Sequence, residues 1–163
     1  MAEQDQPISG APGADAPAAT IVNQYIKDLS FENPNAFDVF QSFAGATPKI
    51  DVAIDIGGEK KSDEAHEVEL KFTITTQSDE RGAFVIELVY AGLFAVRNMT
   101  EEHLEAFMHV QAPFILFPFA RRIISDVTRD GGYPPLMLDP IDFTSLYQQR
   151  LAALAGQEKK ADA

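Results

Sequence analysis

The segment Ala83–Val96, which reads AFVIELVYAGLFAV, is apolar on both sides of any strand that it could form. One alternating set of its side chains consists of Phe84, Ile86, Leu88 and Tyr90. The other set contains Val85 and Val89, interrupted by Glu87. A half-exposed strand alternates apolar and polar residues, so this segment needs cover on both of its faces.

Two segments upstream alternate as half-buried strands do. Residues 49–56 place four apolar side chains on one face, Ile50, Val52, Ile54 and Ile56. The pair Gly57 and Gly58 should end this strand. Residues 66–76 repeat the pattern, and the turn sequence SDERG at 78–82 would join them to Ala83–Val96 as a hairpin. The sequence therefore predicts three successive antiparallel strands.

Residues 23–33 fit either an apolar helical stripe or a strand, and we interpret them as a strand that Pro34 ends. In a regular strand, one face would carry Asp28, Ser30 and Glu32. The opposite face would carry Tyr25, Lys27, Leu29 and Phe31.

After residue 97 the spacing of apolar residues changes from that of strands to that of helices. Residues 98–110 predict a short helix capped by Asn98 or Thr100. Pro113 at a first helical position then predicts a long helix that Gly131 and Gly132 stop. Asp142 can cap a last amphipathic helix.

Strands followed by helices predict the α+β class, with a four-stranded antiparallel sheet and with the long helix and the shorter helices packed on one face. The long helix is apolar around most of its circumference, so it must be buried on more than one side. One chain cannot cover both this helix and Ala83–Val96, which predicts association with a second copy.

Composition limits the class of protein. The 163 residues, 45% of them hydrophobic, suit one domain with a real core. We expect a disordered tail at 1–20, a single domain at 21–155 and a second tail at 156–163. The net charge of −12, from 25 acids and 13 bases, disfavours nucleic acid and anionic lipid as partners.

No signal peptide is recognised, and the longest uncharged apolar run, 112–120, is about half of the ~20 residues that cross a bilayer. We therefore expect a soluble protein with no direct membrane insertion, and a cytoplasmic location by default.

The sequence offers no constellation that would catalyse a reaction. His103 and His109 do not have the i, i+4 spacing of a helical zinc site, and His66 lies in an acidic turn. The chain has no cysteine, no phosphate-binding loop and no nucleophile elbow. We expect no enzymatic activity, no metal and no cofactor.

Three segments resemble the SecB family of export chaperones: YIKDLSFENPNAFDVFQ, AFVIELVYAGLFAV and APFILFPFARRIISDVTRDGGYPPLMLDPIDF. They follow one another over nearly the whole expected domain. The resemblance implies a cytoplasmic holdase that keeps precursor proteins unfolded and delivers them to the translocation ATPase SecA. It also implies a homotetramer, a dimer of dimers with helices sandwiched between sheets.

The resemblance also implies roles for particular residues. The family's docking surface for SecA corresponds to Asp28, Glu32, Val85 and Glu87. Positions that influence the association of dimers correspond to Ile86, Leu88 and Tyr90. The groove that binds unfolded clients would be lined near Phe43, Ile50, Val52, Phe84 and Leu136.

The alternative is a small-molecule protein with a helix on a sheet, such as an acyl-ligand binder or a hot-dog thioesterase or dehydratase. Those folds usually place the central helix after the first strand and need a catalytic carboxylate or histidine beside it. Here the long predicted helix follows all the strands, which favours the chaperone.

Overall fold

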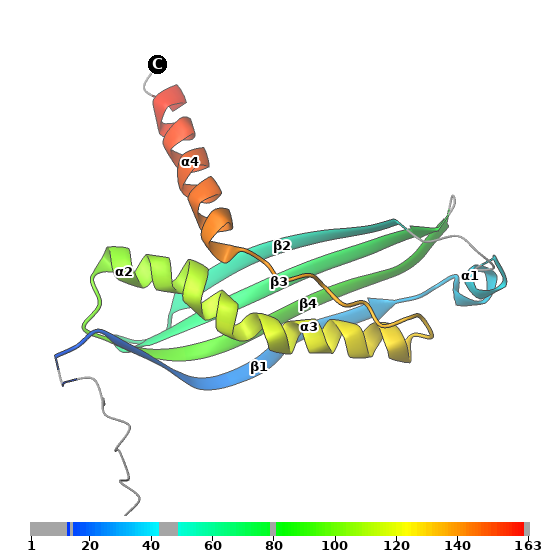
Figure 1. Cartoon of the computed structure of the whole chain (residues 1–163), viewed down its shortest axis with the longest axis horizontal. Helices are drawn as coiled ribbons and strands as arrows, with labels where there is room; N and C mark the ends of the chain where they lie inside the picture. Colours follow the sequence, from blue (N-terminus) through cyan, green and yellow to red (C-terminus); the bar gives the residue numbers. More distant parts are fainter. Residues whose placement is uncertain (1–12, 14, 43–48, 79–80, 162–163) are drawn as a thin grey trace, which may run out of the picture.

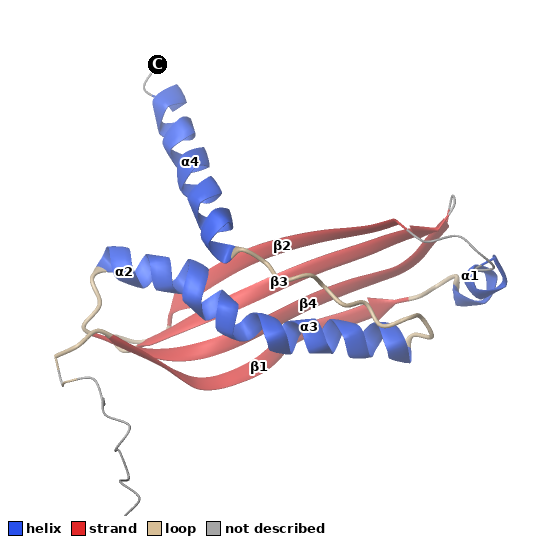
Figure 2. Ribbon diagram, viewed as in Figure 1, coloured by secondary structure: helices blue, strands red, loops and turns tan. Residues whose placement is uncertain are grey.

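A four-stranded antiparallel sheet forms the body of the chain (Figures 1 and 2). The computed structural model describes residues 13, 15–42, 49–78 and 81–161. The strands are β1 (Ala18–Glu32), β2 (Lys49–Lys60), β3 (Ala65–Ser78) and β4 (Arg81–Arg97). Their order in the sheet is β1-β4-β3-β2, so that β1 and β2 are the edges.

A long helical segment lies on one face of this sheet (Figure 1). Helix α2 (Glu101–Ala106), a π-helical turn η1 (Phe107–Gln111) and α3 (Ala112–Asp130) follow one another and cross the sheet as one long rod (Figure 1). The extended segment after α3 runs back over the sheet, and α4 (Phe143–Ala161) then points away from the body (Figure 1). The predicted α+β class, with the helices on one face, is confirmed.

The core forms where β3 and β4 face the helices. Every second side chain of these strands is buried there; on β4 they are Phe84, Ile86, Leu88, Tyr90, Phe94 and Val96. Helix α3 covers them with Leu116, Phe117, Ala120, Ile123 and Ile124. We call the helix-covered side the inner face and the other side the outer face.

Helix boundaries follow the expected signals. The Thr100 hydroxyl accepts a hydrogen bond from the backbone N–H of His103 and caps α2. Gly131 and Gly132 end α3, and Gly132 has a φ of +91°, which favours glycine. The Asp142 carboxylate accepts a hydrogen bond from the Ser145 backbone N–H at 3.0 Å.

Three boundaries differ from the expectation. Strand β2 does not stop at the glycines but continues to Lys60, and a Cβ at Gly58 would lie only 2.2 Å from Met108 Cε, so the glycine lets the helix approach the strand. Pro113 does not begin a separate helix, because η1 leads directly into α3. The short helix α1 (Ala36–Ser42) was not predicted.

Strand β1 and helix α4 extend into the ranges expected to be tails. Ala18–Thr20 already belong to β1, and α4 continues through the expected C-terminal tail as far as Ala161. None of the helices in the described part of the chain is long and apolar enough to cross a membrane.

Strand β1 contains two bulges, between Ile21 and Asn23 and between Ile26 and Asp28. Each bulge adds one residue and reverses the side to which the following side chains point. Tyr25 therefore lies on the outer face, whereas Leu29 and Phe31 lie on the inner face. Lys27 contacts the same carboxylate as Tyr25, Glu67, and so lies on the outer face as well. The expectation that Tyr25, Lys27, Leu29 and Phe31 share a face is wrong, because it assumed a regular strand.

Candidate functional site

The acidic face consists of Asp28, Glu32, Val85 and Glu87 on the outer side of β1 and β4. In the strand register Glu32 is opposite Val85, Ser30 is opposite Glu87 and Asp28 is opposite Val89. The three carboxylates are exposed and Val85 is half-buried. Among the residues described, these acids make no ion pair. The structure thus brings the four positions together as a small surface of unpaired charge and apolar area.

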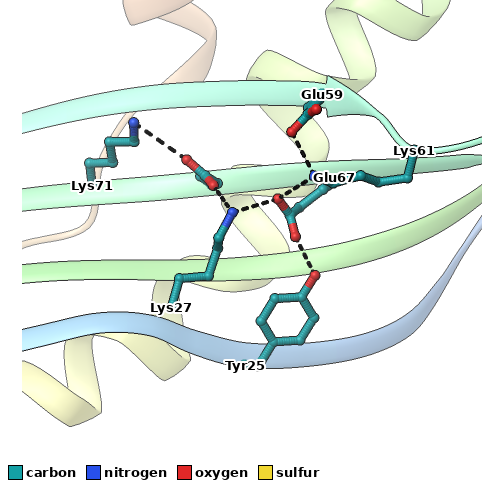
Figure 3. A network of polar contacts seen from close by, with 7 residues as sticks. Tyr25, Lys27, Glu59, Lys61, Glu67 and Lys71 are labelled. Atoms are coloured by element: carbon teal, nitrogen blue, oxygen red, sulfur yellow. Dashed lines mark hydrogen bonds and ion pairs between the residues drawn. The ribbon is translucent and has the colours of Figure 1, made fainter.

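A polar network, the Lys27 bridge, lies beside the acidic face on the same side of the sheet (Figure 3). We define it as Tyr25 and Lys27 on β1 and Glu67 and Glu69 on β3. The Lys27 ammonium donates to Glu67 Oε1 at 2.8 Å and also to Glu69, and the Tyr25 hydroxyl donates to Glu67. These contacts pass over β4, which lies between the two strands.

Further lysines surround the same carboxylates. Lys61 Nζ lies 3.5 Å from Glu67 Oε1 and 2.6 Å from Glu59 Oε2. Lys71 Nζ lies 3.4 Å from Glu69 Oε2. Glu59, Glu67 and Glu69 are thus neutralised by three lysines, whereas Asp28, Glu32 and Glu87 of the acidic face have no such partner among the described residues.

Glu67 is only 4% exposed, and its ionisation depends on the bridge. Burial alone would raise the pKa of its carboxyl. The hydrogen bonds from Lys27 and Tyr25 and the charges of Lys27 and Lys61 outweigh burial and lower the pKa to about 2. The same contacts raise the pKa of Lys27. Glu67 and Lys27 are therefore both charged at neutral pH.

On its inner face, the edge strand β2 exposes the apolar side chains of Ile50 and Val52. Val52 is opposite Ile74 and Ile50 is opposite Thr76, whose hydroxyl accepts a hydrogen bond from the Phe84 backbone N–H. Phe84 on β4 is buried, whereas Ile50 and Val52 on the edge strand β2 are 40% and 41% exposed. Three of the predicted client residues thus lie at one end of one face.

Aromatic rings cluster at this end of the inner face. Phe84 lies with its ring centroid 4.8 Å from Tyr133 and 5.6 Å from Phe31, and Phe40 lies 5.1 Å from Tyr133. Leu136, in the segment after α3, is half-buried against the core. The remaining predicted client residue, Phe43, lies outside the described residues.

The residues predicted to influence association do not lie on the surface. Ile86, Leu88 and Tyr90 point toward the helices, as expected, but they are buried within the single chain. They can influence association only through the residues that cover them. Tyr90 illustrates this, since its ring stacks on Phe119 at a centroid distance of 6.4 Å and its hydroxyl donates to Gln24 at 3.2 Å.

The exposed apolar residues of this region instead lie on α3 and on the edge strand β1. We call them the association patch: Val22, Ile26, Phe114, Ile115 and Phe119. Phe114 is 71% exposed and Ile26 is 47% exposed. The sequence showed that α3 is apolar nearly all round, but not which of its residues the sheet leaves uncovered.

The described residues contain no group of His, Asp and Glu side chains able to hold a metal ion. The ring of His109 stacks on Tyr147 with a centroid distance of 5.3 Å, at the contact between η1 and α4. His66 is buried on the inner face, and burial, with the nearby charge of Lys60, lowers the pKa of its ring.

Comparison with known proteins agrees with this arrangement. Residues 13–154 match the family model described as preprotein translocase subunit SecB. The protein-export protein SecB of Erythrobacter litoralis is 48% identical over 157 residues, which cover 96% of this chain and 87% of the relative. That of Afipia carboxidovorans is 41% identical over 157 residues, covering 96% and 97%.

A solved structure shows the same fold. It is the Mycobacterium tuberculosis Rv1957 SecB-like chaperone in complex with a ChAD peptide from the Rv1956 HigA1 antitoxin. The TM-score is 0.64 at 19% identity, with 76% of this chain and 90% of that chain covered.

Proposed function

This chain belongs to the SecB family of protein-export chaperones, and from that membership we propose that it is a holdase for unfolded precursor proteins. It would bind them without nucleotide, keep them competent for translocation and pass them to SecA in the cytoplasm. A chaperone role, and not an enzymatic one, follows from the family.

One observation carries the proposal: the two faces of the sheet offer surfaces of opposite character. One end of the inner face exposes the apolar side chains of Ile50 and Val52, and the aromatic rings of Phe84, Tyr133 and Phe40 cluster at the same end. Unfolded chains expose apolar side chains that such a surface can bind without reading a sequence. Weak binding at several such surfaces of one assembly would give a high apparent affinity.

The acidic face suits a different partner. Unpaired carboxylates on exposed strands attract a positively charged module, and the apolar area at Val85 can hold it after the encounter. We assign this surface to SecA, with Asp28, Glu32 and Glu87 supplying the charge.

The association patch supports a homotetramer. Phe114, Phe119 and Ile26 are exposed apolar side chains, and a second copy of the chain would cover them. Helices would then be sandwiched between the sheets of two copies.

Two variants test the assignment of the faces. Val52→Asp should weaken binding of an unfolded precursor and leave SecA binding intact, whereas Glu87→Lys should do the opposite. The measurements are the delay of precursor refolding, with and without ATP, and a titration against SecA. Loss of both activities in either variant, or client release that needs ATP without SecA, would contradict the proposal.

The alternative of an acyl-ligand protein or hot-dog enzyme is not favoured. The long helix follows all four strands in the chain, and the family is one of chaperones. Saturable binding of a small acyl ligand, measured by intrinsic fluorescence, would revive this alternative.

A further inference from the structure

Tyr25 and Lys27 of the Lys27 bridge lie in a part of β1 whose pairing with β4 is irregular. The two bulges of β1 isolate residues 23–26 from the rest of the strand. Between the bulges, even-numbered side chains face inward: Gln24 is opposite Gly92 and Ile26 is opposite Tyr90. Outside the bulges, odd-numbered side chains such as Ile21 and Leu29 face inward.

A regular strand without bulges would present different residues to the helices. Tyr25 and Lys27 would point inward, and Ile26 would point outward. The inner face would then carry an ammonium group where the structure has Ile26, beside Tyr90 and the ring of Phe119 stacked on it.

Packing within one chain constrains this segment only weakly. β1 is an edge strand with one neighbour, β4, and the inward-facing Ile26 remains 47% exposed. The register of an edge strand with little buried surface is weakly specified. Phe31 is better anchored, because its ring packs against Phe84 and beneath Gly131, but it lies beyond the second bulge.

The outward-facing side chains supply the missing constraint. Tyr25 and Lys27 both reach across β4 to the nearly buried Glu67, 42 and 40 residues further along the chain. The β4 residue opposite Tyr25 is Ala91, whose small side chain is fully buried and leaves room for these contacts. Turning the segment over would leave Glu67 buried without either hydrogen bond.

We propose that the Lys27 bridge is the positioning element of the association patch: from the outer face it fixes residues 23–26 so that Ile26 completes the apolar surface on the inner face. The inference rests on the proposed homotetramer. Lys27 itself touches no residue of the patch, so its effect on assembly is transmitted through the strand.

A matched pair of variants separates this role from a general effect of charge. Lys27→Met keeps the aliphatic stem and removes the ammonium group. Lys71→Met removes the same charge from the same face, but Lys71 lies on β3 and contacts only Glu69 of the bridge, at 3.4 Å. Light scattering at fixed protomer concentration measures the mass of each assembly.

Lys27→Met should raise the dissociation constant of the tetramer by roughly tenfold or more, as expected when an interface loses an apolar anchor. Lys71→Met should leave it within about twofold, the range of a neutral surface change. Equal effects of the two variants, or none from Lys27→Met, would overturn the proposal.

The register is measured independently of assembly. The chain has no cysteine, so a pair introduced at Asn23 and Leu93, which are direct partners across β1 and β4, reports the register between the bulges. Disulfide formation in this pair should fall in the Lys27→Met background and persist with Lys71→Met.

The two readouts distinguish the possible failures. A lower disulfide yield with unchanged mass would show that the bridge sets the register without positioning the patch, and would overturn the proposal. An unmodified chain that is monomeric would contradict the proposed tetramer, whereas the disulfide measurement would still report on the bridge. Circular dichroism of each variant confirms that it is folded.

Discussion

Replacing Glu67 by glutamine tests how much a buried charge contributes to the stability of this fold. The substitution keeps the shape of the side chain and an oxygen that can accept from the Tyr25 hydroxyl. It removes the negative charge that Lys27 contacts at 2.8 Å. Lys27 retains its contact with Glu69, so the ammonium group is not left alone.

The magnitude follows from the pKa of the carboxyl. The difference between the ordinary pKa of 4.5 and about 2 in the folded protein corresponds to roughly 3 kcal/mol, at about 1.4 kcal/mol for each unit of pKa. The folded state holds its proton less tightly than the unfolded state. This stabilisation is therefore complete above the unfolded pKa and is lost as the pH falls from about 4.5 toward about 2.

We therefore expect Glu67→Gln to lower the free energy of unfolding by roughly 2–3 kcal/mol at pH 7. This difference in free energy between the variant and the unmodified chain should narrow as the pH falls below about 4.5. Urea unfolding at a series of pH values and one protomer concentration measures both quantities. Glu59→Gln is the control. Glu59 is an exposed partner of Lys61, and its loss should cost less than about 0.5 kcal/mol.

Two results would refute this reasoning. A difference in free energy of unfolding that stays constant down to pH 3 would mean that the charge of Glu67 does not cause it. Equal stability of Glu67→Gln and the unmodified chain at pH 7 would mean that the cost of burying the charge cancels its contacts.

Three further predictions concern other parts of the molecule. Glu87→Lys should weaken SecA binding by at least about tenfold but change the free energy of unfolding by less than about 0.5 kcal/mol, because the residue is exposed; a large loss in a urea titration would show a structural role instead. Phe114→Asp should shift the assembly toward smaller species in light scattering without unfolding the chain, since Phe114 is 71% exposed, whereas Leu88→Asp would place a charge in the core and unfold it. The lowered pKa of His66 means that the unfolded state binds the proton more tightly, so stability should fall as the pH drops below about 6.5; His66→Gln should remove this loss between pH 7.5 and 5.5, and an unchanged slope would exclude His66 as its cause.

Much of the candidate site could be predicted from local pattern. Alternation placed Val85 and Glu87 on the side opposite Phe84, and the register confirms this arrangement. Alternation also placed Asp28 and Glu32 on one face of their strand, and both lie on the outer face. The shared face of Ile50 and Val52 follows from the same rule, and both side chains are exposed on the edge strand β2.

The placement of Tyr25 and Lys27 could not be predicted in this way. A bulge adds a residue without altering the apolar pattern that the rest of the strand shows. The contacts that stabilise it join Lys27 to Glu67, 40 residues away in the chain. Only the pairing of β1 with β4 and of β4 with β3 brings these side chains together.

The sequence by itself determined the periods of the strands, the helix ends at Gly132 and Asp142, two candidate caps at Asn98 and Thr100, and the family. These features depend on neighbouring residues: side-chain alternation, capping hydrogen bonds and the backbone freedom of glycine. The tertiary structure decided which of the apolar residues are covered. Leu88 on β4 is buried, whereas Phe114 on α3 is exposed, although both residues are apolar. The way in which α3 lies on the sheet sets this difference in burial.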